Sequence, residues 1–109
     1  MKIKDVLNNS NFNLINNGDT LREINKTFAS DLLSHVMGFA EEDDILITVL
    51  NNINVLGVAS LLDFSGVIFS HNINVNDAII AKANELNIPL LRTKLSTAEA
   101  VVILDKLGV

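Results

Sequence analysis

Residues 45–70, ILITVLNNINVLGVASLLDFSGVIFS, decide the fold of this chain. They open with Ile45–Leu50, an almost continuous apolar run of the kind found in strands that are buried on both faces. A helical pattern follows over 51–62, and Gly66–Ser70 is a second apolar run. A strand, a crossover of this length and another strand predict two parallel strands of one sheet.

The pattern continues to the end of the chain. The periodicity predicts a helix over Val75–Leu86 and a strand over Ile88–Arg92, with a proline near its start where a missing N–H is tolerated. Ser96 and Glu99 have the spacing of a capping box, which predicts a helix from there to Leu107. We expect three adjacent parallel strands: Ile45–Val49, Val67–Phe69 and Pro89–Leu91.

The first third of the chain adds shorter elements. We expect a helix over 2–8, a short strand around Phe12–Ile15 and a second strand over Arg22–Ala29. Ser30 is a suitable N-cap for a further helix. One apolar face is expected on that helix: Leu32, Leu33, Val36 and Met37. The predicted fold class is therefore α/β, a mainly parallel sheet with flanking helices, in a single domain over 1–109.

Composition excludes several classes of protein. The net charge is −5, and the eight basic residues are scattered, so the chain lacks the basic patch of a nucleic-acid binder. There is no cysteine for a disulfide or a cysteine-based metal site. The N-terminus lacks the apolar run of a signal peptide, and no apolar stretch is long enough to span a membrane. A cytoplasmic protein is the expectation.

The hydrophobic content of 49% is high for 109 residues. One explanation is a sheet that is covered on both faces, whose strands are apolar throughout. The other is an exposed apolar patch that a second copy of the chain covers. Both remain open, and the second leads us to expect a homodimer.

The run Glu41–Asp44 is the densest group of acidic residues. We interpret it as a solvated turn that leads into the strand at Ile45, with a divalent-cation site as the alternative. No glycine is present to loop four consecutive carboxylates around one ion. His35 and His71 have no obvious partner, so we expect no metal site and no cofactor. No catalytic motif is found, and we expect no catalytic residues.

A candidate binding site follows from the sheet itself, because ligands of open parallel sheets bind outside the carboxyl ends of the strands. Helix N-termini near Asn52 and Ser96 would point N–H groups there, which suits an anion. The alternative is ordinary loop and cap chemistry. The expected ligand-binding residues are Thr48, Asn51, Asn52, Ser70, His71, Asn72, Arg92 and Thr93.

These residues belong to a recognisable pattern. Five segments resemble the DRTGG domain family over most of the chain: Ile47-Thr48, the helix starting near Asn51, Gly66–Phe69, Ile88–Leu91 and Ser96–Glu99. The stretch Ala29–Ser34 is similar to stand-alone members of about this length. The family is named for an Asp-Arg pair after one strand and a Thr-Gly-Gly after the next. Asn51-Asn52 and Ser70-His71-Asn72 stand in those places here, so a permanent cation and two glycines are missing.

The resemblance implies a fold similar to the N-terminal domain of HPr kinase. It also implies a regulatory or dimerising module that is not a catalyst, and in some members an adenine-nucleotide sensor. Embedded members sit beside CBS domains in regulated pyrophosphatases and in some phosphate acetyltransferases. We therefore expect a non-enzymatic homodimeric module that binds a small anionic ligand, an adenine nucleotide among the candidates, or a partner protein. The alternative is a structural interaction subunit without a small-molecule ligand, and an enzyme that uses His71 ranks last.

Overall fold

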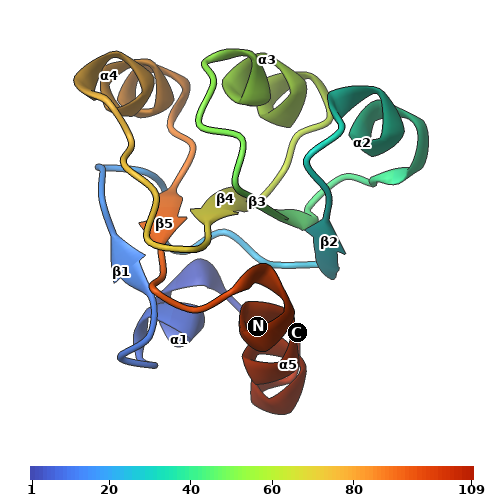
Figure 1. Cartoon of the computed structure of the whole chain (residues 1–109), viewed down its shortest axis with the longest axis vertical. Helices are drawn as coiled ribbons and strands as arrows, with labels where there is room; N and C mark the ends of the chain where they lie inside the picture. The colour runs from blue at the N-terminus through green and yellow to red at the C-terminus, as the bar shows by residue number, and fades with distance from the viewer.

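The computed structural model describes all residues, 1–109, which form a layered α/β fold. The elements are α1 (Ile3–Leu7), β1 (Asn13–Leu14), β2 (Thr27–Ala29), α2 (Leu33–Phe39), β3 (Ile45–Thr48), α3 (Asn54–Leu61), β4 (Gly66–Phe69), α4 (Asp77–Leu86), β5 (Leu90–Arg92) and α5 (Thr97–Leu107). Helices α2, α3 and α4 cover one face of the sheet, and α1 and α5 cover the other (Figure 1). We call these the upper and lower layers.

The sheet has the order β1-β5-β4-β3-β2. Strands β2, β3, β4 and β5 are parallel, and β1 is antiparallel to β5 at one edge. The three apolar runs are therefore adjacent parallel strands, which confirms the prediction. All residues of β3 and β4 are buried, as expected for strands that are covered on both faces.

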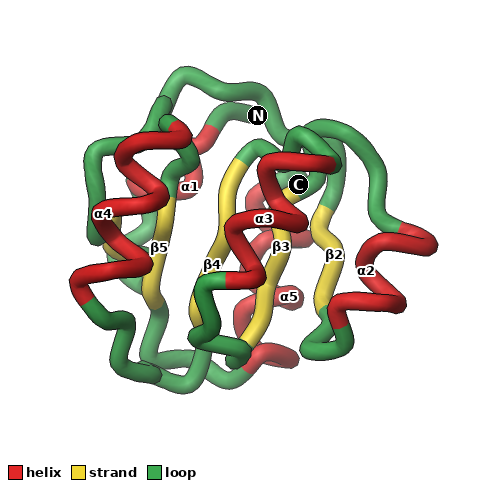
Figure 2. Tube along the Cα trace, turned by 90° about the horizontal axis from the view of Figure 1, so that it is seen from above, coloured by secondary structure: helices red, strands yellow, loops and turns green.

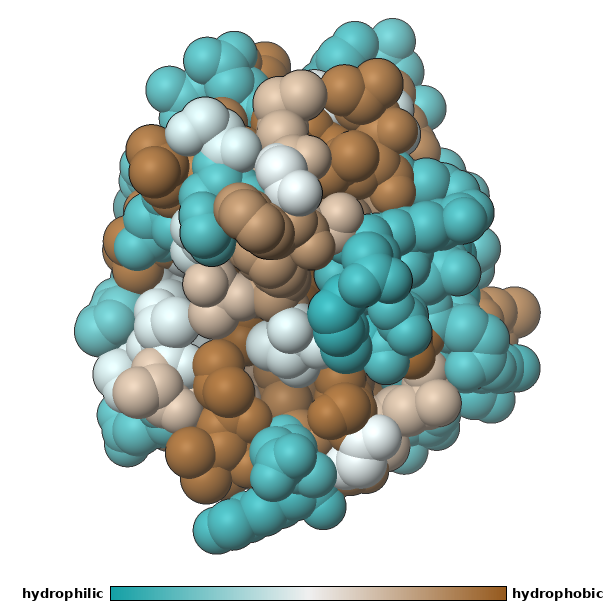
Figure 3. Space-filling view, turned by 90° about the vertical axis from the view of Figure 1, so that its right-hand side faces the viewer, coloured by the Kyte–Doolittle hydropathy of each residue, from teal (hydrophilic) through white to brown (hydrophobic).

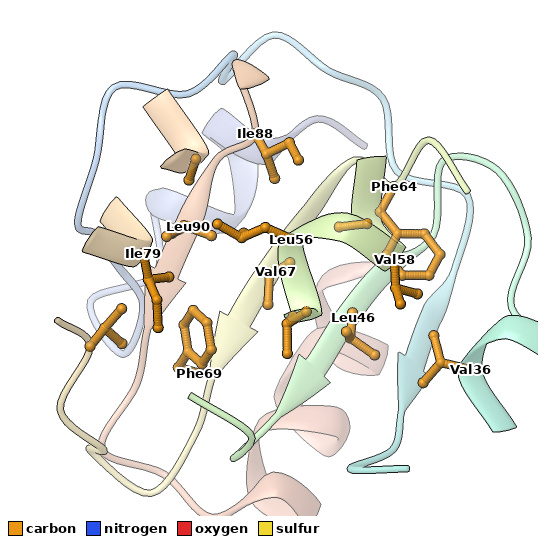
Figure 4. Packing of buried hydrophobic residues seen from close by; sticks show 14 residues of the cluster. Val36, Leu46, Leu56, Val58, Phe64, Val67, Phe69, Ile79, Ile88 and Leu90 are labelled. Carbon is orange, nitrogen blue, oxygen red and sulfur yellow. The ribbon is translucent and has the colours of Figure 1, made fainter. Parts of the chain in front are cut away.

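Two apolar cores flank the sheet. Alternate strand residues point to opposite faces, so Val67 and Phe69 pack under α3 and α4, whereas Ile68 packs against the lower layer. Figure 4 shows the upper core, where side chains from three helices meet those of the strands. The lower core is smaller and is closed by Ala100 and Leu104 of α5.

Two N-terminal elements differ from their predicted bounds. The strand expected over Arg22–Ala29 is formed only at Thr27–Ala29, because the backbone around Glu23 pairs with the N-terminal residues instead of the sheet. The Ile3 N–H donates to the Arg22 carbonyl oxygen, and the Ile24 N–H donates to the Met1 carbonyl oxygen. The helix expected from Ser30 begins at Leu33. The residues before Leu33 make other contacts: the Ser30 hydroxyl accepts a hydrogen bond from the Leu32 N–H, and the Asp31 carboxylate accepts one from the Thr48 hydroxyl at the end of β3.

The predicted apolar face of α2 is not buried as a unit. Val36 is fully buried, but Leu32 and Met37 are exposed, and Leu33 is half-buried. The reason is position: α2 lies at the outer end of the upper layer, beyond β2, and has a helix on only one side (Figure 2).

Gly18 shows how the N-terminal loop is seated. A Cβ atom at this position would overlap the backbone of Ile88 and Pro89, so only glycine permits the close approach. Asn16 fixes the same contact, since its side chain donates to the Ile88 carbonyl oxygen at 2.7 Å and accepts the Leu90 N–H at 2.8 Å. The predicted turn therefore docks against the start of β5.

Candidate functional site

The carboxyl ends of β3, β4 and β5 lie side by side, and Figure 4 shows the arrowheads of the parallel strands pointing the same way. The register aligns Thr48 with Phe69 and Phe69 with Arg92, so these three residues form a row on the upper side. The loops after the strands form one connected surface, because the Ser70 N–H donates to the Thr48 carbonyl at 3.2 Å and the Thr93 N–H to the Phe69 carbonyl at 2.9 Å. We call this surface the carboxyl edge.

Three of the predicted site residues are buried and form hydrogen bonds within the carboxyl edge: Thr48, Ser70 and Thr93. The Thr48 hydroxyl donates to Asp31 at 2.7 Å, and the Ser70 and Thr97 hydroxyls are 2.7 Å apart. The Thr93 hydroxyl accepts the Leu95 N–H at 3.2 Å. These hydroxyls fix the loops in place.

The loop after β4 has an unusual backbone. His71 and Asn72 both have positive φ angles, 59° and 52°, the left-handed conformation that glycine adopts most readily. Their N–H groups donate to the carbonyl oxygens of Leu95 and Thr93 at 2.8 and 2.9 Å. The conformation thus suits glycine at the two positions where the sequence has His and Asn.

His71 is exposed, and its side chain is turned toward α5. Its Nε2 accepts the N–H of Thr97 at 3.3 Å, so this nitrogen carries no proton in that bond. Hydrogen bonds from the backbone N–H and the side chain of Ser96 lower the pKa of Glu99. The predicted capping box is confirmed, since Ser96 and Glu99 bond each other's backbone. No carboxylate is hydrogen-bonded to His71.

The two asparagines after β3 are exposed on the upper side. The Asn51 side chain donates to the Asn74 carbonyl at 2.8 Å, which ties the loop before α3 to the loop before α4. Asn52 accepts the Asn54 N–H at 2.9 Å at the start of α3. Both side chains retain polar atoms that face solvent.

Arg92 is half-buried and lies at the end of β5. It is aligned with Phe69 of the upper core, so its side chain leaves the sheet on the side of Asn51, while His71 turns toward α5 below. The eight predicted residues thus share one edge but divide between its two sides. The Arg92 guanidinium makes no hydrogen bond and no ion pair within the chain.

Several residues of the edge were not predicted from the sequence. Lys94 is exposed, forms no ion pair and lies in the same loop as Thr93. Its position directly after the predicted site residue Thr93 could have identified it from the sequence. Asp31 accepts the Thr48 hydroxyl and, at 2.8 Å, the Val49 N–H. Asp31 follows the end of β2, which is the fourth parallel strand. Had β2 been predicted to be parallel to β3, the rule on strand ends would have included Asp31 among the site residues.

The acidic run Glu41–Asp44 lies at the opposite end of the sheet. We expected a solvated turn here, but one of its four carboxylates is fully buried. Asp44 is fully buried, and its oxygens accept from Lys26 at 2.8 and 3.0 Å and from the Glu41 N–H at 2.8 Å. Asp43 is paired with Arg22 at 2.7 Å. These carboxylates bind cations of the chain itself. No group of three or more His, Cys, Asp or Glu side chains has the arrangement of a metal site.

The surface has two hollows, and neither is at the centre of the carboxyl edge. One, of about 570 Å³, runs between α3 and α4. The other, of about 330 Å³, lies on α5 around Val102. Figure 3 shows hydrophobic surface over α2 above and over α5 below.

None of the five helices has the length and apolar character that crossing a bilayer requires.

Comparison with known proteins places the chain in a family. It is similar to a crystal structure of the CBS and DRTGG domains of the regulatory region of Clostridium perfringens pyrophosphatase, complexed with the activator diadenosine tetraphosphate. The TM-score is 0.75 at 16% identity, over 97% of this chain and 46% of that one, so this chain spans less than half of the length of the crystallised regulatory region. None of the curated protein sequences compared with the chain matches it. The DRTGG domain model matches residues 5–107, and the chain therefore belongs to the DRTGG domain family.

Proposed function

We propose that this chain is a non-enzymatic regulatory module that binds a small anion of the adenine-nucleotide class at its carboxyl edge and works as a homodimer. The ligand lies on the upper side, against Arg92, Asn51 and Asn52. The buried hydroxyls of Thr48, Ser70 and Thr93 hold the loops beneath it.

The observation that carries the proposal is the free guanidinium of Arg92. The other arginine, Arg22, is engaged by Asp43 and Asp63. Arg92 has no such partner in a chain with 13 acidic and 8 basic residues. A guanidinium presents a fork of donors that matches a phosphate. Lys94, two residues further on, adds a second free cation to the same loop.

Two further features support an anionic ligand. The helices α3 and α4 begin at this edge, and their first N–H groups carry partial positive charge. The DRTGG-containing region similar to this chain belongs to a regulatory region and was crystallised with an adenine dinucleotide. This chain lacks the Asp-Arg pair of the family after β3, and Arg92 offers a cation from β5, two strands away in the sheet.

The geometry around His71 supports a role other than catalysis. A histidine base needs a nucleophile within reach and a group that orients it. Here the His71 Nε2 is used by the Thr97 N–H, and the Ser70 hydroxyl is buried against Thr97. Neither group is left to act on a substrate.

A second candidate function is a structural interaction subunit without a small-molecule ligand. It is favoured by the two hollows, which lie between α3 and α4 and on α5, away from Arg92, and which are lined mainly by hydrophobic residues. In that case the carboxyl edge has only a structural role.

A thermal-shift screen with adenine mononucleotides and dinucleotides tests the proposal. A ligand that binds only the native state at a hundredfold excess over its Kd stabilises it by about 2.7 kcal/mol. We expect at least one nucleotide to raise the Tm, and adenosine, which lacks the phosphate, to leave it unchanged. If every nucleotide leaves the Tm unchanged, the interaction subunit is the better account.

A further inference from the structure

Strand β2 lies at one edge of the sheet, and the backbone on its outer side is unpaired. The Lys26 carbonyl oxygen accepts the N–H of the first residue of β3 at 2.9 Å, and the Ser30 N–H donates to a β3 carbonyl at 3.2 Å. Backbone groups of successive strand residues point to opposite sides, so those of Thr27 and Ala29 point away from β3. Their N–H and C=O groups have no hydrogen-bond partner in the chain and are open to a further strand.

The usual protection of an edge strand is incomplete at β2. Edges are commonly blocked by short length, by proline, by a bulge or by a lysine that projects over the open side. The strand is short, but it contains no proline or glycine, and the Lys26 ammonium is bonded to the buried Asp44 carboxylate at 2.8 Å. The Thr27 hydroxyl is buried and has no hydrogen-bond partner. A Ser or Thr directly opposite Thr27 on an added strand would be such a partner, because paired residues share one face of a sheet.

Aromatic and aliphatic side chains flank this open edge on its upper side. The ring of Phe28 lies 6.1 Å from that of His35, which lies 4.6 Å from that of Phe39, so the three rings form a row from β2 along α2. Phe39 and Leu32 are 66% and 63% exposed, and the segment 32–40 contains no Asp, Glu, Lys or Arg. Figure 3 faces this side of the molecule and shows hydrophobic surface above and below. Apolar side chains of an added strand would therefore have contacts.

The charge around the same edge is negative. At the start of β2 one cation, Lys26, is shared between the carboxylates of Glu41 and Asp44, and the Glu41 side chain is 68% exposed. Asp31 is exposed just after the end of the strand. A second copy of the chain would bring the same carboxylates and a further net charge of −5. A segment with Lys or Arg at its ends is the complementary occupant.

We propose that the open edge of β2 binds an extended segment of a partner protein, which joins the five-stranded sheet as a further strand. The segment carries apolar residues at the alternate positions that face α2, Ser or Thr opposite Thr27, and basic residues at its ends. In this mode of recognition main-chain hydrogen bonds give affinity, and alternate side chains give specificity. The site goes beyond the proposed nucleotide binding, since β2 and Arg92 of β5 are separated by two strands.

A designed peptide, Lys-Val-Thr-Val-Thr-Val-Lys with blocked ends, tests the proposal on the full chain. In an extended strand its Val side chains lie on one face and its Thr side chains on the other. Hydrogen exchange of single amides, followed by NMR, should slow at Thr27 and Ala29 when the peptide is added. The same peptide with Glu in place of both Lys residues should bind more weakly, and the difference should shrink at high salt.

The variant Ala29→Pro separates the edge from the rest of the fold. Proline removes a donor that faces outward and leaves the bonds between β2 and β3 in place. The Kd of the peptide should rise roughly two- to tenfold, the loss of one backbone hydrogen bond. Leu14→Pro is the matched control at the opposite edge, where the Ile15 N–H bonds to β5 and that of Leu14 points away, and it should leave the Kd unchanged.

Three results would overturn the proposal. The first is unchanged exchange at Thr27 and Ala29 in the wild type with the peptide, a readout that does not depend on whether a proline variant folds. The second is an equal Kd for wild type and a folded Ala29→Pro. The third is exchange at both amides that slows as the concentration of the chain alone is raised, because a second copy then occupies the edge. The nucleotide site is tested separately in the thermal-shift screen.

Discussion

Replacing Asp44 with alanine is expected to lower the free energy of unfolding by about 3 kcal/mol. The Asp44 carboxylate is fully buried and accepts from the Asn25 side chain, twice from Lys26 and from the Glu41 N–H. Removal of one partner of a buried pair costs roughly 3–5 kcal/mol. We expect the lower end, because the Lys26 side chain is 43% exposed and water can solvate its ammonium group.

Urea denaturation followed by circular dichroism measures this change. In a domain of this size it corresponds to a fall in Tm of roughly 10–15 °C. Glu42→Ala is the matched control, since Glu42 is an exposed neighbour in the same acidic run with no bonding partner. It should change the stability by less than about 0.5 kcal/mol. Equal effects of the two substitutions would refute the argument that Asp44 anchors the start of β3.

The pH dependence gives the same prediction a second readout. The hydrogen bond to Asp44 raises the pKa of Lys26 above its model-peptide value of 10.5. A raised pKa in the folded state means that the pair stabilises the protein fully below pH 10.5 and that this stabilisation is lost as the pH rises through the raised value. Asp44→Ala should therefore show a smaller loss of stability at alkaline pH than the wild type.

Further predictions concern the helix cap and the glycines. Ser96→Ala should cost about 1 kcal/mol of unfolding free energy in urea titrations, because it removes the N-cap of α5. The pKa of Glu99 is lowered in the folded state, so its ionised carboxylate stabilises the fold fully above pH 4.5, and this stabilisation is lost as the pH falls through the lowered pKa. In urea titrations over this acidic range the wild type should therefore lose this part of its unfolding free energy, whereas Glu99→Gln, which has no ionisable group there, should not. Gly18→Ala should destabilise by roughly 2 kcal/mol through its clash with the backbone of Pro89. Gly38→Ala, at an open helical position, should leave the Tm unchanged or raise it.

The parallel sheet could be predicted from the sequence because its signal is local. The runs at β3, β4 and β5 are apolar at consecutive positions, which only strands covered on both faces require. The capping box before α5 is local as well, and it was predicted to the residue.

The start of α2 could not be predicted in the same way. Ser30 has the side chain of an N-cap, but Asp31 bonds to Thr48, 17 residues away, and this contact delays the helix to Leu33. The burial of Asp44 has a similar cause, because its partner Lys26 is 18 residues distant. Such polar contacts between distant residues leave no periodic pattern.

For the candidate site, the rule that ligands bind outside the carboxyl ends of parallel strands was enough to place all eight predicted residues at one edge of the sheet. The side to which each turns depends on the register, which aligns Arg92 with Phe69 and which the sequence alone does not contain. Ser70 and His71 are hydrogen-bonded to Thr97 at the start of α5, so their side chains lie on the lower side of the sheet, opposite to Arg92.

The affinity of Arg92→Ala for ATP, measured by isothermal titration calorimetry beside the wild type, tests the central claim most directly. Loss of one charged hydrogen bond costs about 1.5–3 kcal/mol, so the Kd should rise by roughly tenfold to more than a hundredfold. Lys106→Ala, which removes an exposed lysine from the far end of α5, should leave the Kd unchanged. The same Kd for Arg92→Ala and wild type would contradict an anion site at the carboxyl edge.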